Sequence, residues 1–96
     1  MSEASIHQQG DALKVSGRLN FASVASLLTA NAWLQGDQLI VDLAEVEHSN
    51  SAGLALLLEW MKIAQQKDLQ IKYHNVPEQL LVIARAYGVD QDLPII

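Results

Sequence analysis

The side chains best suited to chemistry in this chain are gathered in one short segment, His48-Ser49-Asn50-Ser51-Ala52-Gly53. A strongly apolar run follows it, which predicts that a helix begins at Ser51. The first turn of a helix has unpaired N–H groups, and its dipole favours negative charge there. The Ser51 hydroxyl could therefore cap the helix, accept a phosphate or contact a partner. Capping is the commonest of these roles and contributes about 1 kcal/mol.

Catalysis is the weaker interpretation of the same segment. Ser51 and His48 could form a nucleophile and its base, but no Gly-x-Ser-x-Gly turn surrounds the serine. The other two histidines, His7 and His74, fall on predicted strands, whereas His48 falls in a predicted loop. Their spacing is not that of metal ligands. We therefore expect no metal site.

Other familiar site chemistry is also missing. Asp42 and Glu45 could pair as carboxylates, but we expect Asp42 to end a strand near solvent. The sequence has no glycine-rich phosphate loop. We accordingly expect no catalytic residues and no cofactor, and the protein is predicted not to be an enzyme.

Composition limits the class of protein. The chain has 96 residues, of which 50% are hydrophobic, so we expect a single domain over residues 1–96. Its net charge of −5 argues against nucleic acid as a partner and against electrostatic binding to anionic lipid. The absence of cysteine fits a cytoplasmic protein. We see no signal peptide, and no apolar run is long enough to insert in a membrane.

The periodicity predicts an α/β protein. A hairpin is expected from strands at residues 6–9 and 12–16, ended by Gly17, and further strands at residues 38–43 and 69–73. Helices are expected over residues 21–35, capped by Asn20, over residues 51–67, and from Pro77 to just before Gly88. Residues 89–96 should wrap over the surface. The order β-β-α-β-α-β-α gives a mixed four-stranded sheet with helices packed against it.

The helix after Ser51 is apolar over an unusually wide arc. Its expected core stripe consists of Leu54, Leu57, Leu58, Met61 and Ala64. A further apolar flank lies outside that stripe, formed by Leu56, Trp60 and Ile63. The arc spans roughly 240°, against the 100° or more of an ordinary surface helix. Either neighbouring elements cover this flank, or it meets another protein.

The corner at Ser51 resembles that of the STAS domain family, named for sulfate transporters and anti-sigma-factor antagonists. That family places an acidic residue, a hydroxyl residue, a small residue and Gly-Leu here. Ser51 matches the hydroxyl, and Gly53-Leu54 match the Gly-Leu. The segment Ser16-Gly17-Arg18-Leu19-Asn20 resembles a second family element. Three further stretches, residues 53–58, residues 80–87 and Leu93-Pro94, are similar to the small STAS subunit of Mla-type phospholipid ABC transporters of Gram-negative bacteria.

This resemblance implies a STAS accessory subunit with no catalytic role. It would bind the cytoplasmic ATPase subunit of the transporter and, through it, the inner-membrane permease, without entering the membrane. It would support transporter assembly and activity, and hence outer-membrane lipid asymmetry. The expected contact residues are the corner and the apolar flank: Ser49, Asn50, Ser51, Ala52, Gly53, Leu56, Trp60 and Ile63.

The alternative is an anti-sigma-factor antagonist that is regulated by phosphorylation of Ser51. In this chain Asn50 stands where the family has its acidic residue. Arg18 and Asn20 replace acidic residues of the earlier element. A kinase-directed switch that depends on the acidic residue is weakened by these departures, whereas a docking role is not.

Overall fold

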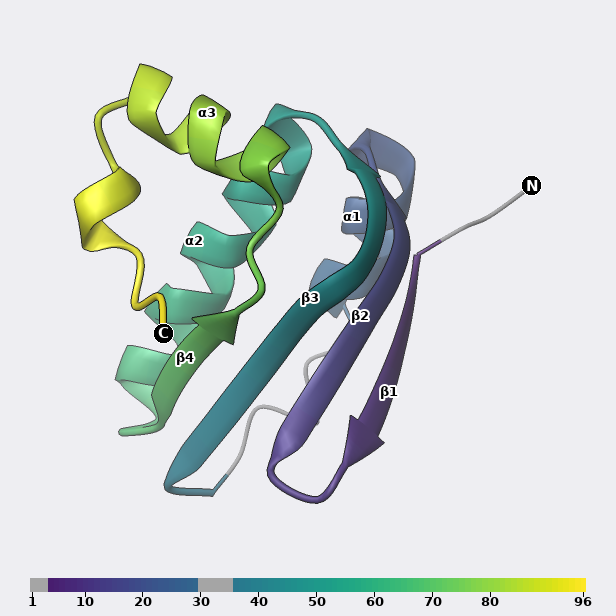
Figure 1. The fold of residues 1–96 in the computed structure, drawn as a ribbon. Coiled ribbons are helices and arrows are strands. Elements are labelled where there is room, and N and C mark those ends of the chain that lie inside the picture. The colour runs from purple at the N-terminus through teal and green to yellow at the C-terminus, as the bar shows by residue number, and fades with distance from the viewer. Residues whose placement is uncertain (1–3, 30–35) are drawn as a thin grey trace.

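The computed structural model describes residues 4–29 and 36–96, which form a four-stranded sheet and three α-helices (Figure 1). The strands are β1 (Ser5–Gln9), β2 (Ala12–Leu19), β3 (Gln38–Ser49) and β4 (Gln70–His74). The helices are α1 (Phe21–Thr29), α2 (Ser51–Gln66) and α3 (Glu78–Ala86), followed by a short 3-10 helix, η1 (Asp90–Asp92). The predicted order and the α/β class are confirmed. The predicted end of the first helix, residues 30–35, lies outside the described residues.

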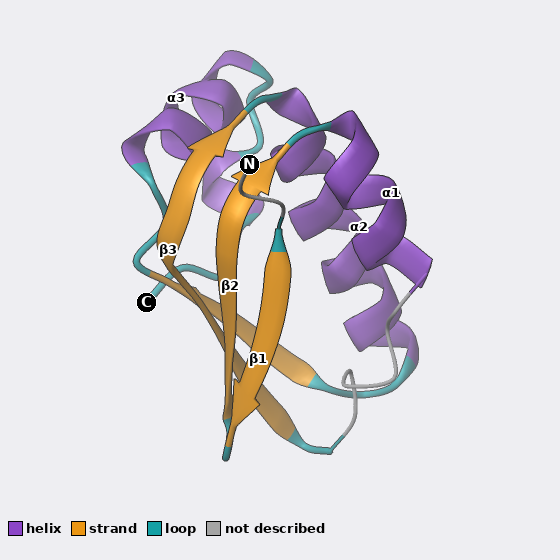
Figure 2. Cartoon of the chain, turned by 90° about the vertical axis from the view of Figure 1, so that its right-hand side faces the viewer, coloured by secondary structure: helices purple, strands orange, loops and turns teal. Residues whose placement is uncertain are grey.

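The strands lie in the sheet in chain order, β1-β2-β3-β4. β1 and β2 form an antiparallel hairpin, whereas β3 is parallel to both β2 and β4. Parallel neighbours require a crossover connection, and α1 and α2 lie within these two crossovers. Figure 2 shows α1 and α2 side by side on one face of the sheet. The amino ends of both helices consequently lie at the same end of the sheet, next to the carboxyl ends of β2 and β3.

Two strands are longer than the sequence predicts. Gly17 does not end β2; it lies inside the strand with φ +92°, next to a register shift, as glycine often does at a bulge. Asp42 likewise does not end β3, which continues to Ser49 by pairing with β2. Beyond the Asp42–His74 pair, β3 has no register partner on β4. Most side chains of this extension are exposed, so its sequence resembles a loop.

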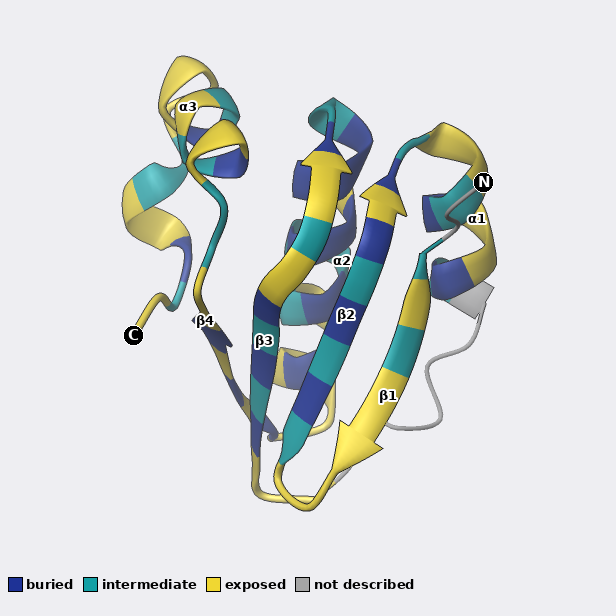
Figure 3. Cartoon of the chain, turned by 45° about the vertical axis from the view of Figure 1, so that its right-hand side comes forward, coloured by how far each residue is buried: buried dark blue, intermediate teal, exposed yellow. Residues whose placement is uncertain are grey.

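The core lies between the sheet and the helices and is mostly aliphatic. Figure 3 shows buried bands alternating with intermediate ones along most of β2 and the first part of β3, as expected for strands with one covered face. Trp60 and Tyr73 are the largest fully buried side chains. The Tyr73 hydroxyl donates a 2.6 Å hydrogen bond to the Leu57 carbonyl oxygen, and burial raises the pKa of Tyr73. This bond joins β4 to α2 inside the core.

The end of the chain is more firmly attached than a surface wrap. Gly88 follows α3 with φ +72°, as its predicted left-handed role requires. Leu93 is buried in the core. The Tyr73 N–H then donates to the Pro94 oxygen (2.8 Å), and the Ile96 N–H donates to the Tyr73 oxygen (3.0 Å). The last residues thus extend the sheet beside β4.

Candidate functional site

The corner between β3 and α2 is capped by Asn50, not by Ser51. Asn50 has extended backbone angles, and its side-chain oxygen accepts a 2.8 Å hydrogen bond from the Ala52 N–H. Its carbonyl oxygen accepts the first helical bond, from the Gly53 N–H (3.0 Å). The capping role predicted for Ser51 is therefore wrong by one residue. Ser51 is the first helical residue and is half-buried, so its hydroxyl is available for another role.

The residues beside Ser51 are structural. Ser49 is 2% exposed, and its hydroxyl donates to the Asn50 oxygen (3.1 Å). A Cβ on Gly53 would overlap the Ser49 Oγ and would lie 3.2 Å from a methyl carbon of Leu80 and 3.3 Å from the Cβ of Leu19. Ala52 is also buried. Ser49, Ala52 and Gly53 are therefore buried and pack the corner together.

An apolar groove of about 310 Å³ begins at Ser51. We call it the Ser51 groove. One wall is the outward side of α2, and the other is formed by residues that follow α3. It is lined by Ser51, Leu54, Ala55, Leu58, Tyr87 and Val89. Tyr87 is 66% exposed although it is aromatic. An exposed tyrosine over an apolar groove is typical of protein-binding surfaces, where aromatic residues supply much of the binding free energy.

Two of the three residues of the predicted apolar flank of α2 are buried in the fold. Leu56 and Trp60 are both 0% exposed, and Ile63 is partly buried against the core. The reason is that α2 contacts α1, α3 and β4, so neighbouring elements cover more than one side of the helix. Of the two interpretations of this flank, coverage by neighbours is correct for Leu56 and Trp60. Neither residue can touch a partner while the domain is folded.

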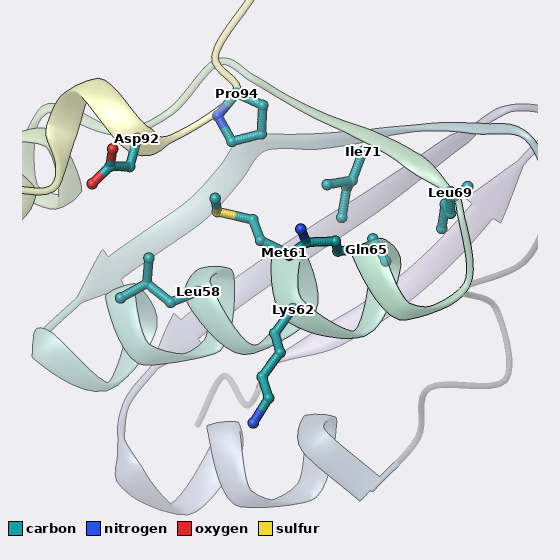
Figure 4. Close-up of a pocket in the computed structure, with 9 residues that line it drawn as sticks. Leu58, Met61, Lys62, Gln65, Leu69, Ile71, Asp92 and Pro94 are labelled. Carbon is teal, nitrogen blue, oxygen red and sulfur yellow. The ribbon is translucent and has the colours of Figure 1, made fainter.

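The open side of α2 lies instead within the predicted core stripe. Leu58 and Met61 were expected in the core but are only partly buried. Both line a second groove of about 480 Å³, drawn in Figure 4, which we call the Met61 groove. It is lined by Leu58, Met61, Lys62, Ala64, Gln65, Leu69, Ile71, Asp92 and Pro94. Leu58 lines both grooves, so the two grooves adjoin one another along α2.

His48 and Asp42, the alternative catalytic groups, have other hydrogen-bond partners in the fold. Among the described residues no cluster of His, Asp or Glu could hold a metal ion. His48 lies on β3, where its Nδ1 is 3.4 Å from Nε2 of Gln79. Asp42 accepts hydrogen bonds at 3.0 Å from the Asn75 side chain and from the Ala44 N–H. These two bonds, the Asn75 bond most, hold the pKa of Asp42 below its usual value, which suits a structural carboxylate rather than an acid catalyst.

The comparisons with known proteins identify the family. The family model described as "Mlab, STAS domain" matches residues 2–96. This chain belongs to the MlaB family of STAS domains. A chain of the Acinetobacter MlaFEDB complex in its ATP-bound state is 30% identical to it, with a TM-score of 0.79 over 96% of this chain and 100% of that one. No curated protein matches significantly.

Two anti-sigma-factor antagonists share the fold. Unphosphorylated SpoIIAA is 11% identical, with a TM-score of 0.72 over 97% of this chain and 85% of that chain. An antagonist from Mycobacterium paratuberculosis is 17% identical, with a TM-score of 0.76 over 99% and 85%. The mixed sheet and its helices are thus those of STAS domains. In the part of the chain that is described, no helix is long and apolar enough to cross a membrane.

Three residues of this region were not predicted from the sequence. Tyr87 and Val89 line the Ser51 groove, and Gln79 accepts a hydrogen bond from the Ser49 N–H. All three lie about 30 residues or more after Ser51, so no local pattern connects them with it. The one available signal was an aromatic residue, Tyr87, just before the glycine that ends a helix.

Proposed function

We propose that this chain is the STAS subunit of an Mla-type phospholipid ABC transporter and binds its cytoplasmic, MlaF-like ATPase subunit. Docking would occur at Ser51 and the Ser51 groove. The single observation that carries this proposal is the position of Ser51: a half-buried hydroxyl, free of the capping role, lines an apolar groove together with an exposed tyrosine. The 30% identity with a chain of the MlaFEDB complex supports the choice of partner.

Binding of this kind can act without chemistry. A subunit that makes better contacts with one arrangement of its partner increases the population of that arrangement. We infer that the chain supports assembly and activity of the transporter in this way and is not an enzyme. It would then be cytoplasmic, held at the inner membrane through the ATPase and the permease, and would contribute to outer-membrane lipid asymmetry.

The test is binding to the purified ATPase subunit of the same bacterium. Ala55→Asp places a charge on the α2 wall of the Ser51 groove, and burying it unpaired should weaken the complex at least a hundredfold. Ala25→Asp is the matched control, because Ala25 is exposed on α1, outside both grooves. Isothermal titration should show loss for the first variant alone. Equal affinity for both variants would remove the groove from the interface.

One observation favours a second function. Ser51 is accessible and its hydroxyl is not required for the cap, as phosphorylation in an anti-sigma-factor antagonist would require. A phosphate there would add about −1.5 to −2 charge and oppose an apolar docking surface. Asn50 replaces the family's acidic neighbour, so we expect Ser51 to be unmodified. Intact-mass analysis of the native protein decides this: a phosphorylated population that changes with stress would favour the antagonist.

A further inference from the structure

The last part of β3 is held by a side chain in place of a strand. β4 stops opposite Asp42, so the extension of β3 toward Ser49 has a strand neighbour only on the β2 side. A backbone N–H that is buried without an acceptor costs about 1–3 kcal/mol. At Ser49 that acceptor is Oε1 of Gln79, at 3.0 Å. Gln79, the second residue of α3, thus takes the place of the missing strand.

The same bond fixes the orientation of the Gln79 amide. Because Oε1 faces the Ser49 N–H, Nε2 is turned toward His48 and lies 3.4 Å from its Nδ1. Gln79 therefore contacts the last two residues of β3. These residues immediately precede the cap Asn50 and the docking residue Ser51.

The far end of α3 leads to the other wall of the Ser51 groove. Leu80 and Ala84 are fully buried, and a Leu80 methyl carbon lies against Gly53 of α2. The Val89 N–H then donates to the Ala84 oxygen (2.9 Å), which sets the chain where Tyr87 and Val89 line the groove. One short helix thus connects the corner that carries Ser51 with the wall that faces it.

We propose that Gln79 is a positioning residue of the docking site. Through its bond to Ser49 it fixes the first turn of α3 against the corner, and so sets the position of Tyr87 relative to Ser51. This inference rests on the proposed function, because the groove is assigned there to the ATPase. Gln79 itself need not touch the partner.

Two substitutions separate the hydrogen bond from the bulk of the side chain. Gln79→Met keeps the length of the side chain and removes the acceptor, whereas Gln79→Glu keeps an acceptor for the Ser49 N–H. The Glu carboxylate is also tolerated in the first turn of a helix. Gln66→Met is the matched control, since Gln66 is exposed at the end of α2, outside both grooves. Gln79 is exposed as well, so all three variants should fold.

Two measurements test the proposal: amide hydrogen exchange of the free domain, and affinity for the ATPase subunit. Gln79→Met should speed exchange at Ser49 and weaken the complex, each on the order of tenfold. Gln79→Glu and Gln66→Met should stay within about threefold of the parent chain in both measurements. If Gln79 acted only by packing, Gln79→Met would instead keep the exchange rate and the affinity of the parent chain.

The outcomes distinguish this proposal from the proposed function. If the parent chain does not bind the ATPase subunit, the proposed function is wrong. If it binds and Gln79→Met binds equally well, Gln79 does not position the site. Loss of affinity in Gln79→Glu equal to that in Gln79→Met would also overturn the inference, because the acceptor would then be irrelevant.

Discussion

The two sides of α2 both carry apolar residues but differ in how far the fold covers them. On one side Leu56 and Trp60 are fully buried, because the helix is packed among α1, α3 and β4. On the other side Ala55 is exposed and Leu58 is partly exposed, and both line the Ser51 groove. Residue type therefore does not reveal which side of a central helix meets a partner. The elements packed around the helix decide it.

The largest expected effect comes from placing the same charge on each side. Leu56→Asp buries an unpaired carboxylate in the core, which should cost about 3–5 kcal/mol, a large share of a small domain's stability. Leu58→Asp should cost less than about 1.5 kcal/mol of stability, yet should abolish binding of the ATPase subunit. Urea unfolding followed by circular dichroism, with a binding assay, measures both. A folded Leu56→Asp variant that had lost only binding would reverse our assignment of the two sides.

A smaller effect is expected where α2 approaches α3. Replacing a helical glycine by alanine normally stabilises a helix by up to about 1 kcal/mol. At Gly53 the added methyl group would overlap Ser49 Oγ and crowd Leu80. We therefore expect Gly53→Ala to destabilise the domain by about 1–3 kcal/mol. Thermal unfolding gives the sign directly: a raised midpoint would mean that the close approach is not real.

At the corner itself, we expect Asn50 to contribute to stability and the adjacent Ser51 to contribute to docking. Asn50→Ala removes the cap and should cost about 1 kcal/mol of stability. Ser51→Ala should change stability by less than about 0.5 kcal/mol but weaken the ATPase complex, because Ser51 and not Asn50 lines the groove. Chemical denaturation and titration of the two variants test this. If Ser51→Ala lowered the free energy of unfolding as much as Asn50→Ala does, Ser51 would be a capping residue and our assignment would be wrong.

The smallest effect is expected on β3, away from both sides of α2. The pKa of Asp42 is held below its usual value by the Asn75 hydrogen bond, the Ala44 N–H and the charges of Lys14 and His74. A lowered pKa in the folded state stabilises the fold above the unfolded-state pKa, and this contribution is lost as pH falls through the folded-state pKa. Asp42→Asn should therefore be slightly less stable at pH 7 and equal to the parent chain in strong acid. Its affinity for the ATPase subunit should not change.

The sequence predicts the order of elements well because each strand and helix carries its own periodic pattern. It fails where a position depends on distant neighbours. The β3 extension through Val46 carries Glu45, Glu47 and His48 and looks like a loop, although it pairs with the distant strand β2. Leu56 and Trp60 look available for a partner, because no nearby sequence pattern indicates that other elements cover them.

The site was predicted in part for the same reason. The corner at Ser51 is a local motif and could be recognised in the sequence, although the cap fell one residue away, on Asn50. The groove is formed by bringing Tyr87 and Val89 against Ala55 and Leu58. That arrangement exists only in three dimensions.

The strands lie in the sheet in the order in which the ribosome makes them. Each new strand can therefore pair with the one synthesised just before it, and no gap in the sheet waits for a later segment. The four strands and α2 are all available before α3 emerges. The Ser51 groove is different, because its second wall follows α3. A nascent chain can thus pair its four named strands and still lack the second wall of the binding surface, which is completed last.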